Sequence, residues 1–128
     1  MKTKITLLTT FLFLSITTIS AQNEQDLETL SIFSELVKSK NYTAAYNPWM
    51  ELRNRNPKFN KAIFIYGERI LDYKIDNSEG QEKIAFLNDM LKLWEERKSV
   101  FPNITPSGAY MAKACQLQYD NREILNKS

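Results

Sequence analysis

Apolar residues in this chain recur at steps of three and four positions, the spacing that places side chains on one face of an α-helix. The steps predict five helices, over residues 26–39, 42–54, 60–75, 79–99 and 105–119. No stretch alternates apolar and polar residues with a period of two, so we expect an all-α fold without strands. The residues expected to face inward are, in helix order, Leu27, Leu30, Phe33, Leu36 and Val37; Ala45, Trp49 and Leu52; Ile63, Tyr66, Gly67, Ile70 and Leu71; Ile84, Leu87, Met90, Leu91 and Trp94; and Ala109, Met111, Ala112, Cys115 and Tyr119.

Local signals support the predicted helix starts. Asn41 is the expected N-cap of the second helix, because its side chain can accept a hydrogen bond from the first turn. Ser78, followed three residues later by Gln81, predicts a capping box before the fourth helix. Thr105 and Pro106 match a cap and a first-turn proline, which predicts that the fifth helix begins there.

Pro48 falls inside the second predicted helix, where a proline removes one backbone hydrogen bond and kinks the axis. The alternative is a helix that begins at Pro48 with Asn47 as its cap. Ala45 already lies in phase with Trp49, and this favours the kinked helix over the shorter one.

Residues 1–21 have the pattern of a secretory signal peptide of bacterial type. Lys2 and Lys4 precede an apolar, threonine-rich run from Ile5 to Ile19, and a small-residue cleavage site ends at Ala21. The alternative is an uncleaved membrane anchor, but the run is short of the roughly 20 apolar residues that span a bilayer. We expect export, cleavage near Ala21, and a periplasmic or secreted chain that is no longer associated with the membrane.

The charge of the chain changes when the predicted signal peptide is removed. Of the 17 basic residues, residues 1–21 hold two, and they hold no acid, so 15 basic residues remain against 15 acidic residues. Nucleic-acid binding needs a basic surface, so we expect no nucleic-acid partner. We expect residues 22–119 to form one helical domain and the polar residues 120–128 to form a flexible tail.

A short unit occurs twice in the sequence. It consists of a tryptophan, a proline eight residues later, and a small residue ten residues after the proline. The two occurrences lie 45 residues apart, as Trp49, Pro57 and Gly67 and as Trp94, Pro102 and Ala112. We expect both tryptophans to anchor the core, and Gly67 to allow close approach of a neighbouring helix.

The first unit carries a resemblance to a known family. Ala45, Trp49, Leu52 and Pro57 have the spacing A-x3-W-x2-L-x4-P, and with Tyr66-Gly67 they make residues 40–70 resemble the tetratricopeptide repeat. The resemblance implies antiparallel helix pairs stacked as a short right-handed α-solenoid, with two repeats plus one terminal helix. The family step is 34 residues, so each repeat here would hold about 11 more, or three helical turns, which preserves the inward faces. The 45-residue step also fits HEAT-like helical repeats.

The resemblance also implies a binding surface, because similar proteins use the first helix of each repeat to line a concave groove for a peptide or partner helix. Placed on this sequence, the partner-binding residues would be Lys38, Lys61, Phe64, Glu68, Asp72 and Lys113, with Ser34 and Gln116 beside them. Phe64 lies off the apolar stripe of its helix, so we expect it to be exposed and its removal to leave stability nearly unchanged.

Residues that could carry chemistry are few. The chain has no histidine, which removes the commonest general base. Cys115 falls on the apolar side of the fifth helix, so we expect a buried structural thiol. Glu68 and Asp72 share a helical face and could bind a cation or act as acid and base, but with Arg69 and Lys74 nearby a solvated helix face explains the pair as well. We therefore expect no enzyme, no cofactor and no metal site.

Four basic residues surround the turn at Pro57, namely Arg53, Arg55, Lys58 and Lys61. Such a cluster could bind an acidic partner. The interpretation that we favour is a solvated loop with helix C-terminal charge.

The expected function is that of an exported protein-interaction scaffold that binds a protein or peptide. The alternative is a structural module that forms the N-terminal part of a longer solenoid. The fifth helix spreads apolar residues over more than one face, at Tyr110, Met111, Cys115, Leu117 and Tyr119. Uncovered apolar strips of this kind mark interfaces, so the sequence also predicts self-association through this helix.

Overall fold

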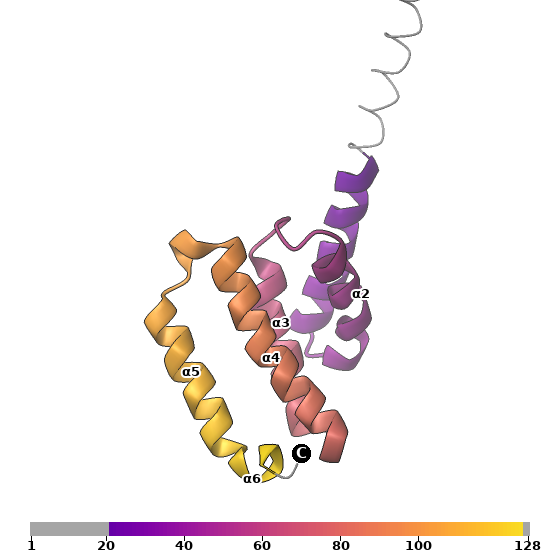
Figure 1. Cartoon of the computed structure of the whole chain (residues 1–128). Helices are drawn as coiled ribbons and strands as arrows, with labels where there is room; N and C mark the ends of the chain where they lie inside the picture. Colours follow the sequence, from indigo (N-terminus) through magenta and orange to yellow (C-terminus); the bar gives the residue numbers. More distant parts are fainter. Residues whose placement is uncertain (1–20, 127–128) are drawn as a thin grey trace, which may run out of the picture.

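The computed structural model describes residues 21–126, and all the elements in this part of the chain are helices (Figure 1). A helix over residues 21–38 comes first. It is followed by α2 (Tyr42–Arg55), α3 (Ala62–Asp76), α4 (Gly80–Val100), the 3-10 turn η1 (Pro102–Ile104), α5 (Ser107–Asp120) and α6 (Arg122–Leu125). The all-α prediction is confirmed for these residues. The predicted signal peptide, apart from Ala21, lies outside the described residues.

Short connections fold the helices back on one another, so that α2, α3, α4 and α5 follow one another across the molecule (Figure 1). The central helix α3 packs against α2 on one side and α4 on the other, and α5 packs more sparsely on α4. The helix over residues 21–38 lies at the α2 side of the molecule, and α5 lies at the opposite edge.

The hydrophobic core is built by the first four helices. Residues 21–38 contribute Phe33 and Val37, while α5 and α6 contribute no fully buried residue. The core members from α2, α3 and α4 are Ala45, Trp49, Leu52, Ile63, Phe64, Ile70, Leu71, Ile75, Leu87, Met90, Leu93 and Trp94. The predicted inward faces of α2 and α3 are confirmed for most of these residues. Leu27 is 58% exposed, and the nearby Asp26 is buried in its place.

The side chain of Trp49 occupies the place that a side chain at Gly67 would need. A Cβ atom built on Gly67 would lie 2.6 Å from Cζ2 of the Trp49 indole. The indole is fully buried, and its Nε1–H donates a hydrogen bond of 2.7 Å to the carbonyl oxygen of Ile63. The glycine is therefore required for α2 to reach this distance from α3, as the sequence predicts.

Two arginines of the predicted basic cluster form ion pairs with acids of other helices. The Arg53 side chain is 3% exposed and forms ion pairs with Asp89 at 2.9 Å and Glu96 at 2.8 Å, which join α2 to α4. Arg55 binds the buried carboxylate of Asp26 at 2.8 Å and so joins α2 to the helix over residues 21–38. Both arginines lie in the last turn of α2, as the interpretation of helix C-terminal charge predicts. The expectation that they are solvated is wrong, because acids from distant helices pair with them.

The helix starts agree in part with the cap predictions. The Asn41 side chain accepts a hydrogen bond of 3.3 Å from the Ala44 backbone, and α2 runs unbroken through Pro48, so the shorter helix is excluded. The capping box at Ser78 is not formed. Gly80 adopts a left-handed φ of 56° and begins α4, which makes Glu79 the cap residue and leaves the buried Ser78 hydroxyl without a partner in the described structure.

The 45-residue step is visible in the helix bounds, but the second unit packs differently. Helices α2 and α4 end at Arg55 and Val100, and α3 and α5 begin at Ala62 and Ser107, both 45 residues apart. Ala112, the counterpart of Gly67, is nevertheless exposed, and the half-buried alanine beside Trp94 is Ala114. Ala112 and Ala114 are two positions apart, which corresponds to about 200° around a helix. The face of α5 that packs on α4 is therefore not the counterpart of the face of α3 that packs on α2.

We predict opposite effects for two glycine-to-alanine substitutions in helices. Gly67→Ala should destabilise the protein by about 1–3 kcal/mol, because the new methyl group collides with the Trp49 indole. Gly108→Ala, where a Cβ atom would meet no atom within 4 Å, should be neutral or stabilise by up to about 1 kcal/mol through helix propensity. Urea unfolding followed by circular dichroism measures both, and equal effects would contradict the contact.

Phe64 gives a second prediction and corrects the expectation that it is exposed. Its ring is fully buried and packs edge-on against Phe101 at 5.8 Å between centroids. Phe64→Ala should therefore cost about 3–5 kcal/mol, as for other buried aromatic truncations. A melting temperature close to that of the unaltered protein would show that the ring is not part of the core.

Candidate partner groove

A shallow groove lies between α3 and α5, above the edge of the Trp94 indole. Its lining combines carboxylates, one lysine, one amide and apolar surface, from Glu68, Asp72, Trp94, Lys113, Gln116, Leu117 and Asp120. We call it the α3/α5 groove. At ≈ 260 Å³ it is smaller than the 300–1,000 Å³ of typical small-molecule sites. Its size and openness suit a few side chains of a protein partner.

Glu68 is the centre of the charged network in this groove. Its carboxylate accepts a hydrogen bond of 2.9 Å from the Lys113 ammonium, and lies 3.6 Å from the guanidinium of Arg97. The Tyr110 hydroxyl also donates to it, at 3.4 Å. The three partners come from α4 and α5, so Glu68 ties both helices to α3. Its charge is therefore committed to the fold.

Lys113 is held over apolar surface as well as by Glu68. Its ammonium lies 5.9 Å from the Trp94 ring centroid and 5.3 Å from that of Tyr110, within the range of cation–π attraction. The side chain is half exposed. Lys113 thus forms a fixed positive charge on the α5 side of the groove.

Asp72 lies one helical turn beyond Glu68 and is available to a partner. Among the described residues, no lysine or arginine lies within 4 Å of its carboxylate. Burial raises the pKa of Asp72 above its ordinary value, and repulsion from Glu68 and Asp76 raises the pKa further, while Lys113 lowers it. A basic group placed beside Asp72 would offset the repulsion from Glu68 and Asp76.

The structure brings three of the six predicted partner residues together, namely Glu68, Asp72 and Lys113, with Gln116 beside them. Lys38 lies on the exposed surface of the helix over residues 21–38, where it pairs with Glu35 at 2.7 Å. Lys61 is exposed immediately before α3.

Phe64 shares a helical face with Glu68 but does not line the groove. Phe101, in the segment after α4, packs against its ring, whereas the same helical face is exposed two turns later, at Asp72. The placement of Phe64 on a binding surface is therefore wrong.

Sequence reasoning did not identify Arg97, Tyr110, Leu117 or Asp120 as neighbours of this groove. The positions of Tyr110, Leu117 and Asp120 depend on the rotation of α5 about its own axis, and the contact of Arg97 with Glu68 depends on how α4 packs against α3. The charge of Arg97 and the aromatic ring of Tyr110 are visible in the sequence, but the helix that each one contacts is not.

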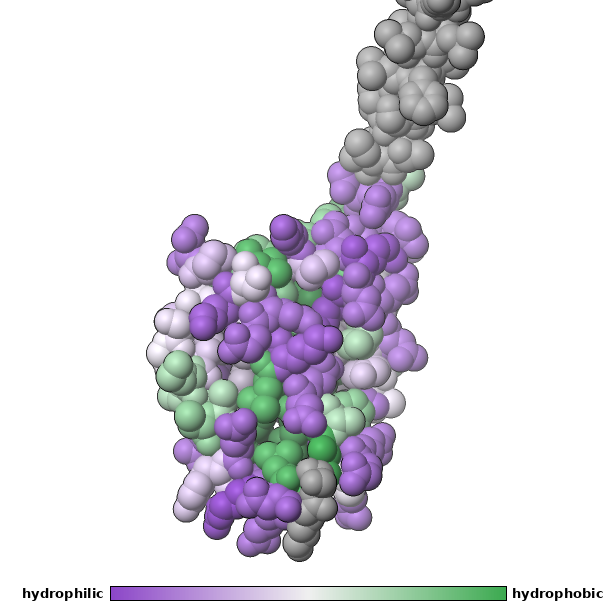
Figure 2. All heavy atoms as spheres, viewed as in Figure 1, coloured by the Kyte–Doolittle hydropathy of each residue, from purple (hydrophilic) through white to green (hydrophobic). Residues whose placement is uncertain are grey.

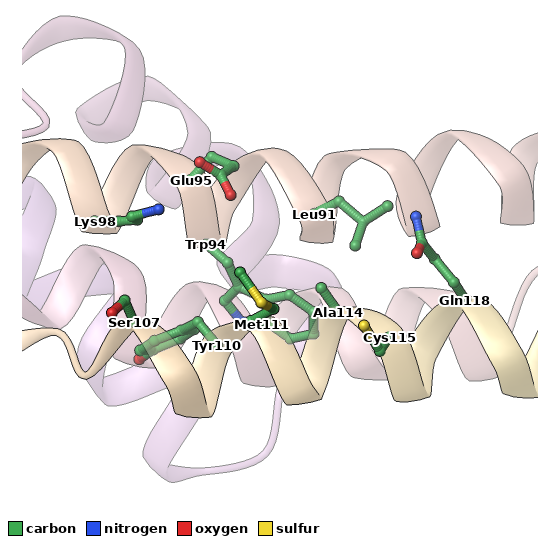
Figure 3. A pocket seen from close by; sticks show the side chains of 10 residues that line it. All are labelled: Leu91, Trp94, Glu95, Lys98, Ser107, Tyr110, Met111, Ala114, Cys115 and Gln118. Atoms are coloured by element: carbon green, nitrogen blue, oxygen red, sulfur yellow. The ribbon is translucent and has the colours of Figure 1, made fainter.

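Cys115 is exposed, and the expectation of a buried thiol is therefore wrong. The reason is again the rotation of α5, which turns Tyr110, Ala114 and Leu117 toward the core cluster and Cys115 away from it. Cys115 lines a second hollow, on the other side of Trp94, between α4 and α5 (Figure 3).

Residues 21–126 contain no cluster of three or more histidine, cysteine or acidic side chains that could hold a metal ion. Within the same range, no helix has the length and apolar character needed to cross a membrane. The sequence matches no known family model, and no curated protein or solved structure is detectably similar to it.

The raised pKa of Asp72 predicts a pH-dependent effect on stability. Because the folded state holds this proton more tightly than the unfolded state, ionisation of Asp72 destabilises the fold as pH rises through the carboxyl range. Asp72→Asn should therefore stabilise the protein at neutral pH, by less than about 1 kcal/mol for a partly exposed charge. Denaturant melts should show that the gain fades as pH falls below the ordinary carboxyl pKa. A gain that persists unchanged at low pH would contradict this assignment.

Proposed function

We propose that this chain is an exported protein-interaction module of the tetratricopeptide-like type, and that the α3/α5 groove binds a segment of a partner protein. The spacing in residues 40–70 and the 45-residue recurrence of helix bounds support a helical-repeat architecture. The pattern of residues 1–21 supports export.

The observation that carries the proposal is the exposed carboxylate of Asp72, which pairs with no basic residue in the described part of the chain and lies beside the apolar surface of Leu117 and Trp94. A partner segment with an apolar side chain next to a lysine or arginine would satisfy both features. The neighbouring Glu68 and Lys113 form an ion pair with each other. The other negative charges of the groove are those of Asp72 on α3 and Asp120 on α5.

Charge reversal at Asp72 tests the groove. The full-length gene is expressed with export, and mass spectrometry of the purified chain should place its first residue at Gln22. We expect Asp72→Lys to weaken capture of partners from the envelope fraction by about tenfold, the equivalent of roughly 1.4 kcal/mol, because a favourable charge pair becomes repulsive.

Glu28→Lys is the matched control. It makes the same charge change at an exposed residue of the first described helix, which does not line the groove. Partners lost with Asp72→Lys and retained with Glu28→Lys should then be measured individually by calorimetry. Equal capture by both variants would mean that the groove is not the binding site.

A further inference from the structure

The outer face of the α4 and α5 pair carries a hollow with an apolar floor. Its walls come from Leu91 and Trp94 on α4 and from Met111, Ala114 and Cys115 on α5 (Figure 3). We call this surface the α4/α5 face. Apolar side chains are visible along the strip between the two helices, with hydrophilic side chains on the α4 side of it (Figure 2).

Helix α5 is poorly covered for an element of 14 residues. None of its residues is fully buried. Met111 is 67% exposed and Tyr119 is 63% exposed, and the Cys115 thiol between them is exposed as well. Contiguous exposed apolar surface of this kind commonly marks an interface.

The α4/α5 face carries few charged side chains, and this bears on which kind of partner can bind there. From Ser107 to Tyr119 the sequence has one charged residue, Lys113, and that residue is bound to Glu68 in the α3/α5 groove. On the surfaces of small domains, about a quarter to a third of the residues are usually charged. The charges at this face, Glu95 and Lys98, come from α4 and have opposite signs.

We propose that the α4/α5 face binds a second copy of this chain about a two-fold axis. In such a contact one patch must supply both a projection and a hollow. Here Met111 lines the hollow together with Leu91 and Trp94 and is 67% exposed, so its side chain is accessible to a second copy. If α5 of each chain packs against the α4/α5 face of the other, the α4 and α5 helices of the two chains together form a four-helix arrangement.

Electrostatics favours the same occupant. A two-fold axis brings like residues near each other, so a charged face would repel its copy. The uncharged strip on α5 avoids this repulsion. Glu95 and Lys98 line the face with opposite charges, so a two-fold axis that passes between them would set Glu95 of one chain against Lys98 of the other. A foreign partner would find no unbalanced charge here to fix its orientation.

Sedimentation velocity on the purified chain tests this proposal. We expect a concentration-dependent dimer, and Met111→Glu should weaken it at least tenfold, because the carboxylate would be buried in the apolar hollow. Ile104→Glu is the matched control, since Ile104 is also exposed, at 48%, but does not line the face. The Ile104→Glu variant should dimerise as strongly as the unaltered chain.

The reactivity of the Cys115 thiol provides an independent measurement of the same contact. Its rate of reaction with a water-soluble thiol reagent should fall as the concentration of the unaltered chain rises, and should stay constant for Met111→Glu. Gln118→Lys, at an exposed residue of the same hollow, replaces Met111→Glu if circular dichroism shows that variant to be unfolded.

Several outcomes would overturn the two-fold contact. These are a monomer at high micromolar concentration with constant thiol reactivity, assemblies larger than two chains, or association that survives Met111→Glu. The test is independent of the α3/α5 groove, because Asp72→Lys changes no residue of the α4/α5 face and should leave sedimentation unchanged.

Discussion

The contact between the Trp49 indole and Gly67 holds the centre of this fold together. The indole lies where a side chain of α3 would otherwise be, and its N–H is satisfied by the carbonyl of Ile63 one turn earlier. On α2 itself the Arg53 guanidinium lies 5.1 Å from the centroid of the same ring. That guanidinium then binds Asp89 and Glu96 on α4. One aromatic side chain therefore sets the spacing of three helices, and a buried arginine fixes their register at some cost in desolvation.

The sequence predicted the helices well because apolar residues recur with helical periodicity, and because Asn41 marks the start of α2. The spacing of Trp49, Pro57 and Gly67 likewise predicted the close approach of α2 and α3 at Gly67. Periodicity cannot say how many faces of a helix are covered. Helix α3 is covered on two sides, so Phe64 is buried although it lies off the stripe. Helix α5 is covered on one side, so Cys115 is exposed although it lies on the expected apolar face.

The candidate groove could be predicted only in part, for a related reason. Helical spacing places Glu68 and Asp72 on one face of α3, and the family resemblance suggested Lys113. The difference between the two carboxylates is invisible in the sequence, because it depends on Lys113 and Arg97 reaching Glu68 and leaving Asp72 unpaired. In the same way, four basic residues around Pro57 resemble a free patch until Asp26, Asp89 and Glu96 are brought to two of them.

The two tryptophans show why both proposed surfaces belong to α5. Trp49 is enclosed by α3 and its N–H is bonded, whereas the buried Nε1 of Trp94 has no hydrogen-bond partner in the described part of the chain. The difference follows from the rotated packing of α5, which meets Trp94 through Tyr110 and Ala114 and leaves a hollow on either side of the indole. A helix that is so lightly covered contributes little to the core, and its free surface is large for its length. The charged side of that surface suits a partner with a basic group, and the uncharged side suits a copy of itself.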